Sequence, residues 1–180
     1  MCGILFYKGN KLNFKDFKNS LKLMNHRGPD YSNVQNLDDV FLGHNRLSII
    51  DLDQRANQPF KSGNYHIVFN GEIYNYKEIS NEEKFDLQTS SDTEVLLKLF
   101  IKYGEKCLDK LNGMFSFVIY NSITKDYFIA RDRLGIKPLY IFEKQDELLI
   151  SSEIAPILAL RSNELDDFAI RQYKKLRMTV

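Results

Sequence analysis

The sequence predicts an α+β domain built mostly on antiparallel sheets. Short apolar runs bounded by Gly, Pro or polar residues recur along the chain, which is typical of strands. Four such runs follow one another in the second half with short polar turns between them, as in an antiparallel meander: residues 114–120, 127–131, 139–142 and 148–152. A smaller number of segments carry apolar residues at helical spacing. The length of 180 residues suits one domain, with room for the start of a second.

Composition and charge exclude several classes of protein. A hydrophobic content of 43%, with 13 Phe and 10 Tyr, indicates a packed globular core. The net charge of +1 gives no reason to expect nucleic acid or a membrane surface as a partner. Two cysteines form no disulfide framework and indicate a reducing compartment, and neither a signal peptide nor a membrane-spanning stretch is evident. We therefore expect a soluble, cytoplasmic protein.

The first half of the chain predicts three strands and one helix. Residues 2–7, 40–51 and 65–69 are apolar runs that suit strands, and residues 14–25 form an amphipathic helix that ends at the turn His26-Arg27-Gly28-Pro29-Asp30. The polar residues 53–63, which include Pro59, are expected to be a loop. A strand that begins at residue 2 would hold the start of the chain rigidly.

Further helices are expected after this region. Residues 77–89 are polar and predict a loop or a short helix. Ser91 and Glu94 have the spacing of a capping box, which opens a helix that runs to Tyr103 and is closed by Gly104. Residues 105–111 predict a shorter helix, and another begins at Ser152-Glu153 with Pro156 in its first turn. Residues 163–175 predict a last helix.

Cys2 is the first candidate for chemistry. Removal of Met1, which cellular processing favours before a small second residue, would leave a thiol and a free α-amine on the same residue. Such an amine has a pKa of about 7.7–8.0, so it can accept a proton near neutral pH. This is the arrangement of N-terminal nucleophile hydrolases, although a Met-Cys start alone is weak evidence. We expect Cys107, in the middle of a helix, only to pack.

Three other positions each allow a structural and a functional interpretation. Asn70-Gly71 between apolar runs is typical of a hairpin turn, but the Asn side-chain amide and the Gly N–H could also converge on an oxyanion, with Gly allowing close approach of a substrate. Arg46 is either a solvated charge or a planar fork for a small carboxylate. Asp92 either complements the helix N-terminus or faces a ligand ammonium. Asn112-Gly113 indicates a turn only.

Taken together, these residues resemble the N-terminal glutaminase domain of glutamine-dependent asparagine synthetases, within the class II glutamine amidotransferases. The resemblance covers nearly the whole chain in eight blocks: MCGI at 1–4, HRGPD at 26–30, RLSIID at 46–51, NGEIYN at 70–75, SDTE at 91–94, LNGMF at 111–115, RD at 131–132 with GIKPLY at 135–140, and SE at 152–153. The blocks favour the asparagine-synthetase branch over other amidotransferase branches.

The resemblance implies a fold and a set of roles. The fold would be the four-layer αββα sandwich of N-terminal nucleophile hydrolases. Cys2 would be the nucleophile with its own α-amine as base, and Asn70 with the Gly71 N–H would form the oxyanion hole. Arg46 would hold the α-carboxylate of L-glutamine, Asp92 and Glu72 its α-ammonium, and the Ile49–Ile50 backbone would line the pocket. No metal or cofactor is expected in this domain.

The resemblance also implies a second domain. We expect residues 1–162 to be the glutaminase domain, and residues 163–180 to begin a linker and the first helix of an ATP-dependent synthetase domain. The pyrophosphate loop of that domain, of the type Ser-Gly-Gly-x-Asp-Ser, is absent from this sequence. ATP and Mg²⁺ are therefore expected only in the synthetase domain of the same polypeptide. A homodimer is possible.

Three functional hypotheses follow. The first is glutamine hydrolysis that supplies ammonia to a domain which amidates aspartate or another carboxylate, such as a sugar acid. The second is a stand-alone N-terminal cysteine amidohydrolase that acts on γ-glutamyl amides. The third is a non-catalytic regulatory or interaction domain, against which the presence of Cys2, Asn70 and Gly71 argues.

Overall fold

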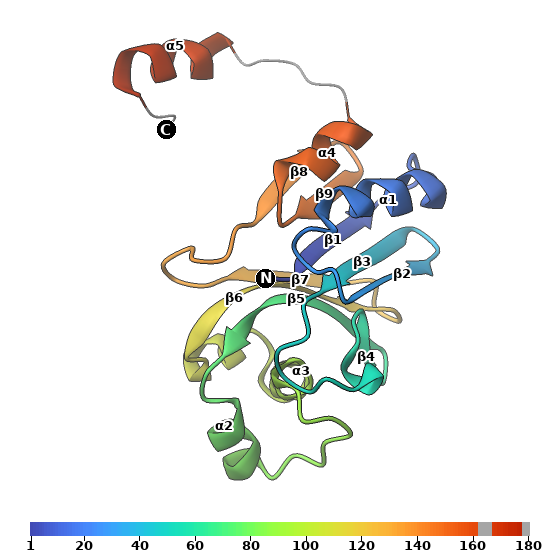
Figure 1. The fold of residues 1–180 in the computed structure, drawn as a ribbon, viewed down its shortest axis with the longest axis vertical. Helices are drawn as coiled ribbons and strands as arrows, with labels where there is room; N and C mark the ends of the chain where they lie inside the picture. The colour runs from blue at the N-terminus through green and yellow to red at the C-terminus, as the bar shows by residue number, and fades with distance from the viewer. Residues whose placement is uncertain (162–166, 178–180) are drawn as a thin grey trace.

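The computed structural model describes residues 1–161 and 167–177. Two antiparallel sheets stack face to face (Figure 1). The first sheet has five strands in the order β2-β3-β1-β9-β8, and every neighbouring pair is antiparallel. Its strands are β1 (Gly3–Lys8), β2 (Tyr31–Leu37), β3 (Val40–Arg46), β8 (Tyr140–Lys144) and β9 (Glu147–Ser151). The start of the chain therefore lies at the centre of a sheet.

The second sheet has four strands in the order β4-β5-β6-β7, again antiparallel throughout. Its strands are β4 (Phe60–Ser62), β5 (Tyr65–Ile73), β6 (Gly113–Asn121) and β7 (Tyr127–Arg131). The facing sides of the two sheets share one apolar core, because alternate residues of each strand point to the same side. This core includes Ile4, Leu42, Val68 and Val118.

Helices cover the outer side of each sheet and complete the predicted four-layer αββα sandwich. The first sheet packs through a second core against α1 (Phe14–Leu21) and α4 (Ile154–Leu160). The other sheet packs through a third core against α3 (Asp92–Tyr103) and, at its edge, α2 (Tyr76–Glu83). Short 3₁₀ turns span Lys22–Met24, Gln54–Ala56 and Gly104–Lys110, and α5 (Asp167–Leu176) follows the sandwich.

The structure corrects several predicted boundaries. The strand predicted over residues 40–51 ends at Arg46, and residues 47–51 form a loop. Two strands have no counterpart among the predictions. β2 is a polar edge strand without an apolar period, and β4 has only three residues. For the predicted helix over residues 163–175, residues 163–166 lie outside the described part of the chain, and α5 covers the remainder.

The predicted meander is wrong as a single sheet. β6 and β7 form a hairpin in one sheet, whereas β8 and β9 form a hairpin in the other. The segment between β7 and β8, residues 132–139, therefore crosses from one sheet to the other. Each hairpin has the sequence signal of a local turn, but no local signal distinguishes a turn from a crossing between layers.

Neither Asn-Gly dipeptide forms a turn. Asn70 and Gly71 lie inside the nine-residue strand β5, which pairs with β6 along its whole length. Gly113 is the first residue of β6, opposite Ile73. Long-range pairing with β6 thus overrides the local turn preference of Asn70-Gly71, and the hairpin interpretation is wrong.

The capping prediction at α3 is confirmed for Ser91 and corrected for Glu94. The Ser91 side chain accepts a hydrogen bond from the Glu94 N–H, as an N-cap should. The Glu94 carboxylate does not return to Ser91 but accepts hydrogen bonds from the N–H groups of Gln88 and Thr89 and from the Thr89 hydroxyl. It therefore fixes the loop that leads into α3.

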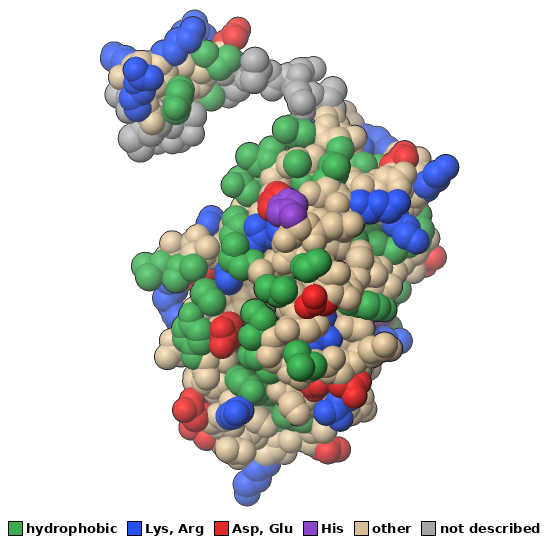
Figure 2. Space-filling view, viewed as in Figure 1, with side chains coloured by type: hydrophobic (Ala, Val, Ile, Leu, Met, Phe, Trp, Pro, Cys, Tyr) green, Lys and Arg blue, Asp and Glu red, His purple; other side chains and the backbone are tan. Residues whose placement is uncertain are grey.

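Acidic and basic side chains alternate over the face of the molecule in Figure 2, among scattered apolar side chains. Basic side chains gather over α5, and the rest of this face shows no large area of one sign, in keeping with the net charge of +1. Among the described residues, no helix is long and apolar enough to cross a bilayer.

Candidate active site

Cys2 lies directly before β1, at the end of the sandwich where β1 and β3 finish their pairing. The Leu47 N–H is 3.4 Å from its Sγ, and the Cys2 carbonyl accepts a hydrogen bond of 2.9 Å from Arg27 Nε. Arg27 in turn forms an ion pair of 3.1 Å with Glu153. The HRGPD motif, predicted only as a turn, thus also anchors the backbone of the nucleophile candidate.

The pKa of the Cys2 thiol lies above its ordinary value. Burial is the main cause, and the nearby Asp92 raises the pKa further. The Leu47 N–H, the Met1 ammonium and Arg46 act in the opposite direction without cancelling the effect of burial. The thiol is therefore mostly protonated at neutral pH, and its reaction requires a base or additional positive charge.

Asn70 faces Cys2 across the gap between the sheets. Ile4 and Val68 both point into the shared core, so the two-residue period of each strand turns Cys2 and Asn70 toward the same layer. The Asn70 side chain is 1% exposed, yet neither its Oδ1 nor its Nδ2 has a hydrogen-bond partner among the described residues. A buried amide without partners is uncommon, because it loses its bonds to water without replacement. Its donors are free for a ligand.

His44 supports this strand from the opposite sheet. Its Nε2 lies 3.1 Å from the carbonyl of Phe69, the residue before Asn70. Complete burial lowers the pKa of His44 to about 3, so the ring is neutral at physiological pH and donates this bond. The contact links the two sheets beside Asn70.

The N–H of Gly71 points away from β6. Phe115, opposite Gly71, bonds instead to Asp132 through both its N–H and its carbonyl. The N–H groups two residues to either side of Gly71 bond to Gln58 Oε1 at 2.7 Å and Asp92 Oδ2 at 3.0 Å. Since alternate N–H groups of a strand point the same way, the Gly71 N–H points to the side that carries Gln58 and Asp92.

Glycine is required at position 71 for packing. A Cβ there would lie 2.3 Å from the carbonyl oxygen of Met114 and 2.7 Å from the Cα of Phe115. The backbone of β6 is therefore what approaches Gly71 closely, whereas the sequence suggested that a substrate would do so. Gly71 keeps β5 and β6 together beside Asn70.

Two carboxylates border the same space. Asp92 is the first residue of α3 and is 5% exposed, and its Oδ2 accepts the Ile73 N–H. Burial raises the pKa of Asp92 to about 6, and the charge of Glu72 raises it too, although backbone N–H groups oppose both. Glu72 points to the same side of β5 as Asn70, because the two residues are two positions apart.

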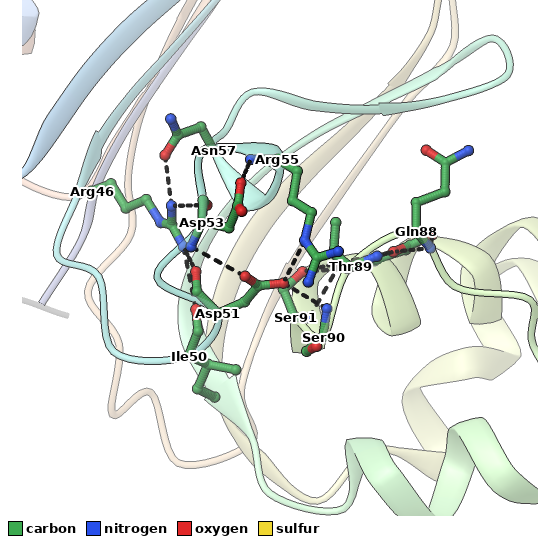
Figure 3. A network of polar contacts seen from close by, with 11 residues as sticks. Arg46, Ile50, Asp51, Asp53, Arg55, Asn57, Gln88, Thr89, Ser90 and Ser91 are labelled. Carbon is green, nitrogen blue, oxygen red and sulfur yellow. Dashed lines mark hydrogen bonds and ion pairs between the residues drawn. The ribbon is translucent and has the colours of Figure 1, made fainter.

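Arg46, the last residue of β3, holds the loop that follows it (Figure 3). Its Nη1 donates to the Asp53 carbonyl at 3.0 Å and to Asn57 Oδ1 at 2.6 Å. Its Nη2 donates to the carbonyls of Ile50 and Asp51. Both terminal nitrogens are therefore occupied by the protein, and a ligand carboxylate would have to replace some of these acceptors.

The structure brings all of the predicted site residues to one cavity of about 160 Å³. The cavity is lined by Cys2, Arg46, Ile49, Ile50, Asn70, Gly71, Glu72 and Asp92. These residues come from both sheets, from the loop after β3 and from the N-terminus of α3. The volume restricts the cavity to a small ligand.

The cavity also contains residues that were not predicted. Gln58 accepts from the Phe69 N–H and donates to Thr93 Oγ1 at 3.2 Å, and no sequence pattern distinguished it from the surrounding loop. Lys137 lines the cavity from the crossing segment, within the block GIKPLY that had already carried the resemblance. In the described ranges, no group of three or more His, Cys, Asp or Glu is placed to hold a metal ion.

Comparisons with known proteins give matches over most of the chain. A family model described as "Glutamine amidotransferase domain" matches residues 1–180. A putative glutamine-hydrolyzing asparagine synthetase of Methanocaldococcus jannaschii is 35% identical over 89% of this chain and 36% of its own length. Asparagine synthetase B of Escherichia coli is 40% identical over 76% of this chain and 26% of its own length. The chain thus spans about a quarter to a third of these relatives.

A solved structure shows the same fold. Glutamine phosphoribosylpyrophosphate amidotransferase of B. subtilis superimposes with a TM-score of 0.75 over 88% of this chain and 43% of its own. The two sequences are 21% identical, so this similarity concerns the fold alone.

Proposed function

Because the chain belongs to the glutamine amidotransferase domain family, we propose that it hydrolyses L-glutamine to L-glutamate and ammonia with Cys2 as the nucleophile. The observation that carries the proposal is the Asn70 amide, which lies buried in the cavity that contains Cys2 and has no hydrogen-bond partner among the residues that the structure describes. A stable fold gains nothing from such an amide, whereas a developing oxyanion in the cavity would use its donors.

The nucleophile requires a free Cys2. After removal of Met1, the α-amine takes the thiol proton, and the sulfur attacks the side-chain amide carbon of glutamine. The carbonyl oxygen becomes an oxyanion that accepts hydrogen bonds from Asn70 Nδ2 and the Gly71 N–H. When this intermediate collapses, the proton held by the α-amine passes to the leaving nitrogen, and ammonia departs. Water then attacks the thioester, which releases glutamate and restores the thiol.

The charged residues around the cavity suit a free amino acid. Asp92 and Glu72 provide negative charge for the α-ammonium group, and Arg46 provides positive charge for the α-carboxylate. The carboxylate would replace carbonyls of the 50–53 loop on the Arg46 guanidinium, and the Ile49–Ile50 backbone would line its site. Glutamine within a peptide lacks both charges and would leave these groups unpaired, so we expect it to be rejected.

The ammonia is proposed to serve an ATP-dependent domain of the same polypeptide. The names of the relatives, glutamine-hydrolyzing asparagine synthetases, and their length, roughly three times that of this chain, support this proposal. That domain would use ATP and Mg²⁺ to amidate aspartate or another carboxylate, such as a sugar acid. The absence of a disulfide among the described cysteines is compatible with a cytoplasmic location.

The test compares the wild type with Asn70→Ala and with Asn112→Ala, the matched change in the other Asn-Gly dipeptide. Glutamate release and labelling by 6-diazo-5-oxo-norleucine are measured, and intact mass and peptide mapping report Met1 and the labelled residue. We expect Cys2 of the Met1-free wild type to be labelled. Asn70→Ala should lower kcat about 10²–10³-fold. Its thermal stability should not fall, since the removed amide forms no hydrogen bond with any described residue.

Three results would contradict the proposal. They are a wild type that releases no glutamate after Met1 is removed, labelling that maps to Cys107, and an Asn70→Ala variant with the kcat of Asn112→Ala.

A further inference from the structure

Lys137 is a buried residue whose ammonium group has no hydrogen-bond or ion-pair partner in the described part of the chain. Its side chain is 5% exposed and lines the cavity with Cys2 and Glu72. Within residues 1–161 and 167–177, its Nζ makes no hydrogen bond and no ion pair. By contrast, the partly enclosed Lys98 is paired with Glu94 at 3.5 Å. The ammonium group therefore borders the cavity without a protein partner, and holding an unpaired charge in a confined space is costly.

The backbone around Lys137 is held firmly. The Asp132 carboxylate accepts the N–H groups of Leu134, Ile136 and Lys137, at 3.2, 2.8 and 3.0 Å. Arg131 donates to the carbonyls of Gly135 and Lys137, each at 2.6 Å. Pro138 further restricts the conformation of the residue before it. The crossing segment therefore presents the Lys137 side chain to the cavity as part of a rigid turn.

The charges around Lys137 are mixed. Cys2, Glu72 and Asp132 face it and favour its charged form, whereas Arg27 opposes it. Burial is the largest influence and lowers the pKa of Lys137. Cys2 is itself faced by the Met1 ammonium, Arg46 and Asp92. Of the groups that face Lys137, the Cys2 thiol is the one that ionises in the proposed reaction.

We propose that Lys137 is a further positioning residue of this site, whose ammonium group in the cavity stabilises the negative charge on the Cys2 sulfur when the thiol ionises. The inference rests on the proposed function, in which the thiol proton passes to the α-amine. Lys137 keeps its own proton throughout and acts by charge alone. The ionised sulfur would supply the partner that the ammonium group lacks in the resting protein.

The test is the pH dependence of Cys2 alkylation by iodoacetamide, mapped by peptide mass spectrometry, in the wild type and in Lys137→Met and Lys137→Arg. Removal of one nearby positive charge should move the midpoint of the profile upward by about one pH unit. Lys137→Arg keeps the charge and should stay close to the wild type. Lys144→Met, at an exposed lysine of β8, is the matched control and should leave the midpoint unchanged.

An unchanged midpoint in Lys137→Met would overturn the inference, as would an equal shift in Lys137→Arg. Thermal melting shows whether each variant folds, and Lys137→Gln serves in place of Lys137→Met if the latter does not. Iodoacetamide does not resemble glutamine, so the profile is measurable even in a protein that hydrolyses none. Failure of this inference is therefore distinguishable from failure of the proposed function.

Discussion

Single residues in the cavity are arranged for a ligand at the expense of the free protein. Within the described ranges, the Asn70 amide has no hydrogen-bond partner, and burial disfavours the ionised form of the Asp92 carboxyl. In an ordinary core, the Asn70 amide would be hydrogen-bonded, and the Asp92 carboxyl would be paired with a positive charge or replaced by an apolar side chain. Bound glutamine should restore the stability lost at each residue, because it supplies the missing charge or hydrogen-bond acceptor. The stability lost in the free protein can therefore be measured by mutation.

Asp92 should make the stability of the protein fall as pH rises. Its pKa is about 6 in the folded state against an ordinary value of 3.8, so the unfolded chain ionises first. Stability is then lost between about pH 4 and pH 6, by about 3 kcal/mol in total. Asp92→Asn keeps an acceptor for the Ile73 N–H and removes the ionisation. We expect this variant to be more stable than the wild type at pH 8 and equal to it below pH 4, by urea unfolding.

Asp146→Asn, at an exposed position, serves as the control and should not alter stability at either pH. The same Asp92→Asn variant should bind glutamine more weakly, because the neutral amide no longer attracts an ammonium group. A wild-type KM for glutamine that does not rise below pH 6 would argue against this role of Asp92.

At the scale of elements, the site depends on how closely β5 and β6 approach. Gly71 allows the approach, and Phe115 leaves the Gly71 N–H free by bonding to Asp132. The capped N-terminus of α3 then brings Asp92 to the same edge. A shift of either strand would move the proposed oxyanion donors relative to Cys2.

Gly71→Ala should therefore reduce both stability and activity. The added Cβ would meet backbone atoms of β6, which cannot rotate away as a side chain could. We expect a loss of about 2 kcal/mol and a fall of about 6 °C in the midpoint of thermal unfolding. Gly63→Asn is the control, because Gly63 has a φ of +57°, which Asn tolerates, and no atom within 4 Å of a Cβ. Equal midpoints for the two variants would refute the packing argument.

At the scale of the whole molecule, the site lies where the chain passes between layers. Cys2 belongs to one sheet and Asn70 to the other, and the segment 132–139 joins the two sheets and presents Lys137. Asp132, 7% exposed, organises this segment. Burial raises the pKa of Asp132, but hydrogen bonds from the N–H groups of Lys137, Ile136, Phe115 and Leu134 lower it by more. The pKa of Asp132 therefore lies below its ordinary value.

Asp132→Ala should destabilise the protein by about 3 kcal/mol at pH 7, because four N–H groups lose a charged acceptor. The depressed pKa means that this contribution is present above about pH 4 and is lost as the pH falls through the folded-state value. The difference from the wild type in urea unfolding should thus shrink in acid. A difference that stays constant from pH 7 to pH 3, or that equals the effect of the exposed control Asp126→Ala, would contradict this account.

Several features of the site are present in the sequence itself. The two-residue period of β1, β3 and β5 places Cys2 with Ile4, Arg46 with Leu42, and Asn70 with Val68, each polar residue on the apolar side of its strand. Ser91 caps the N-terminus of α3 through a hydrogen bond from the N–H of Glu94, which lies only three residues later in the chain. These features rest on local periods and local hydrogen bonds, and for that reason they could be predicted, as could the α+β class.

Tertiary structure alone decided how these strands meet. Asn70-Gly71 carries a turn signal, yet the pairing of β5 with β6 along nine residues outweighs it. The polar edge strand β2 has no apolar period and forms because β3 offers it a partner over seven residues. The division of the last four strands between two sheets, and the burial of Gln58 and Lys137 beside Cys2, depend on contacts between segments far apart in the chain. Such contacts are set by the packing of the whole core, which no local pattern encodes.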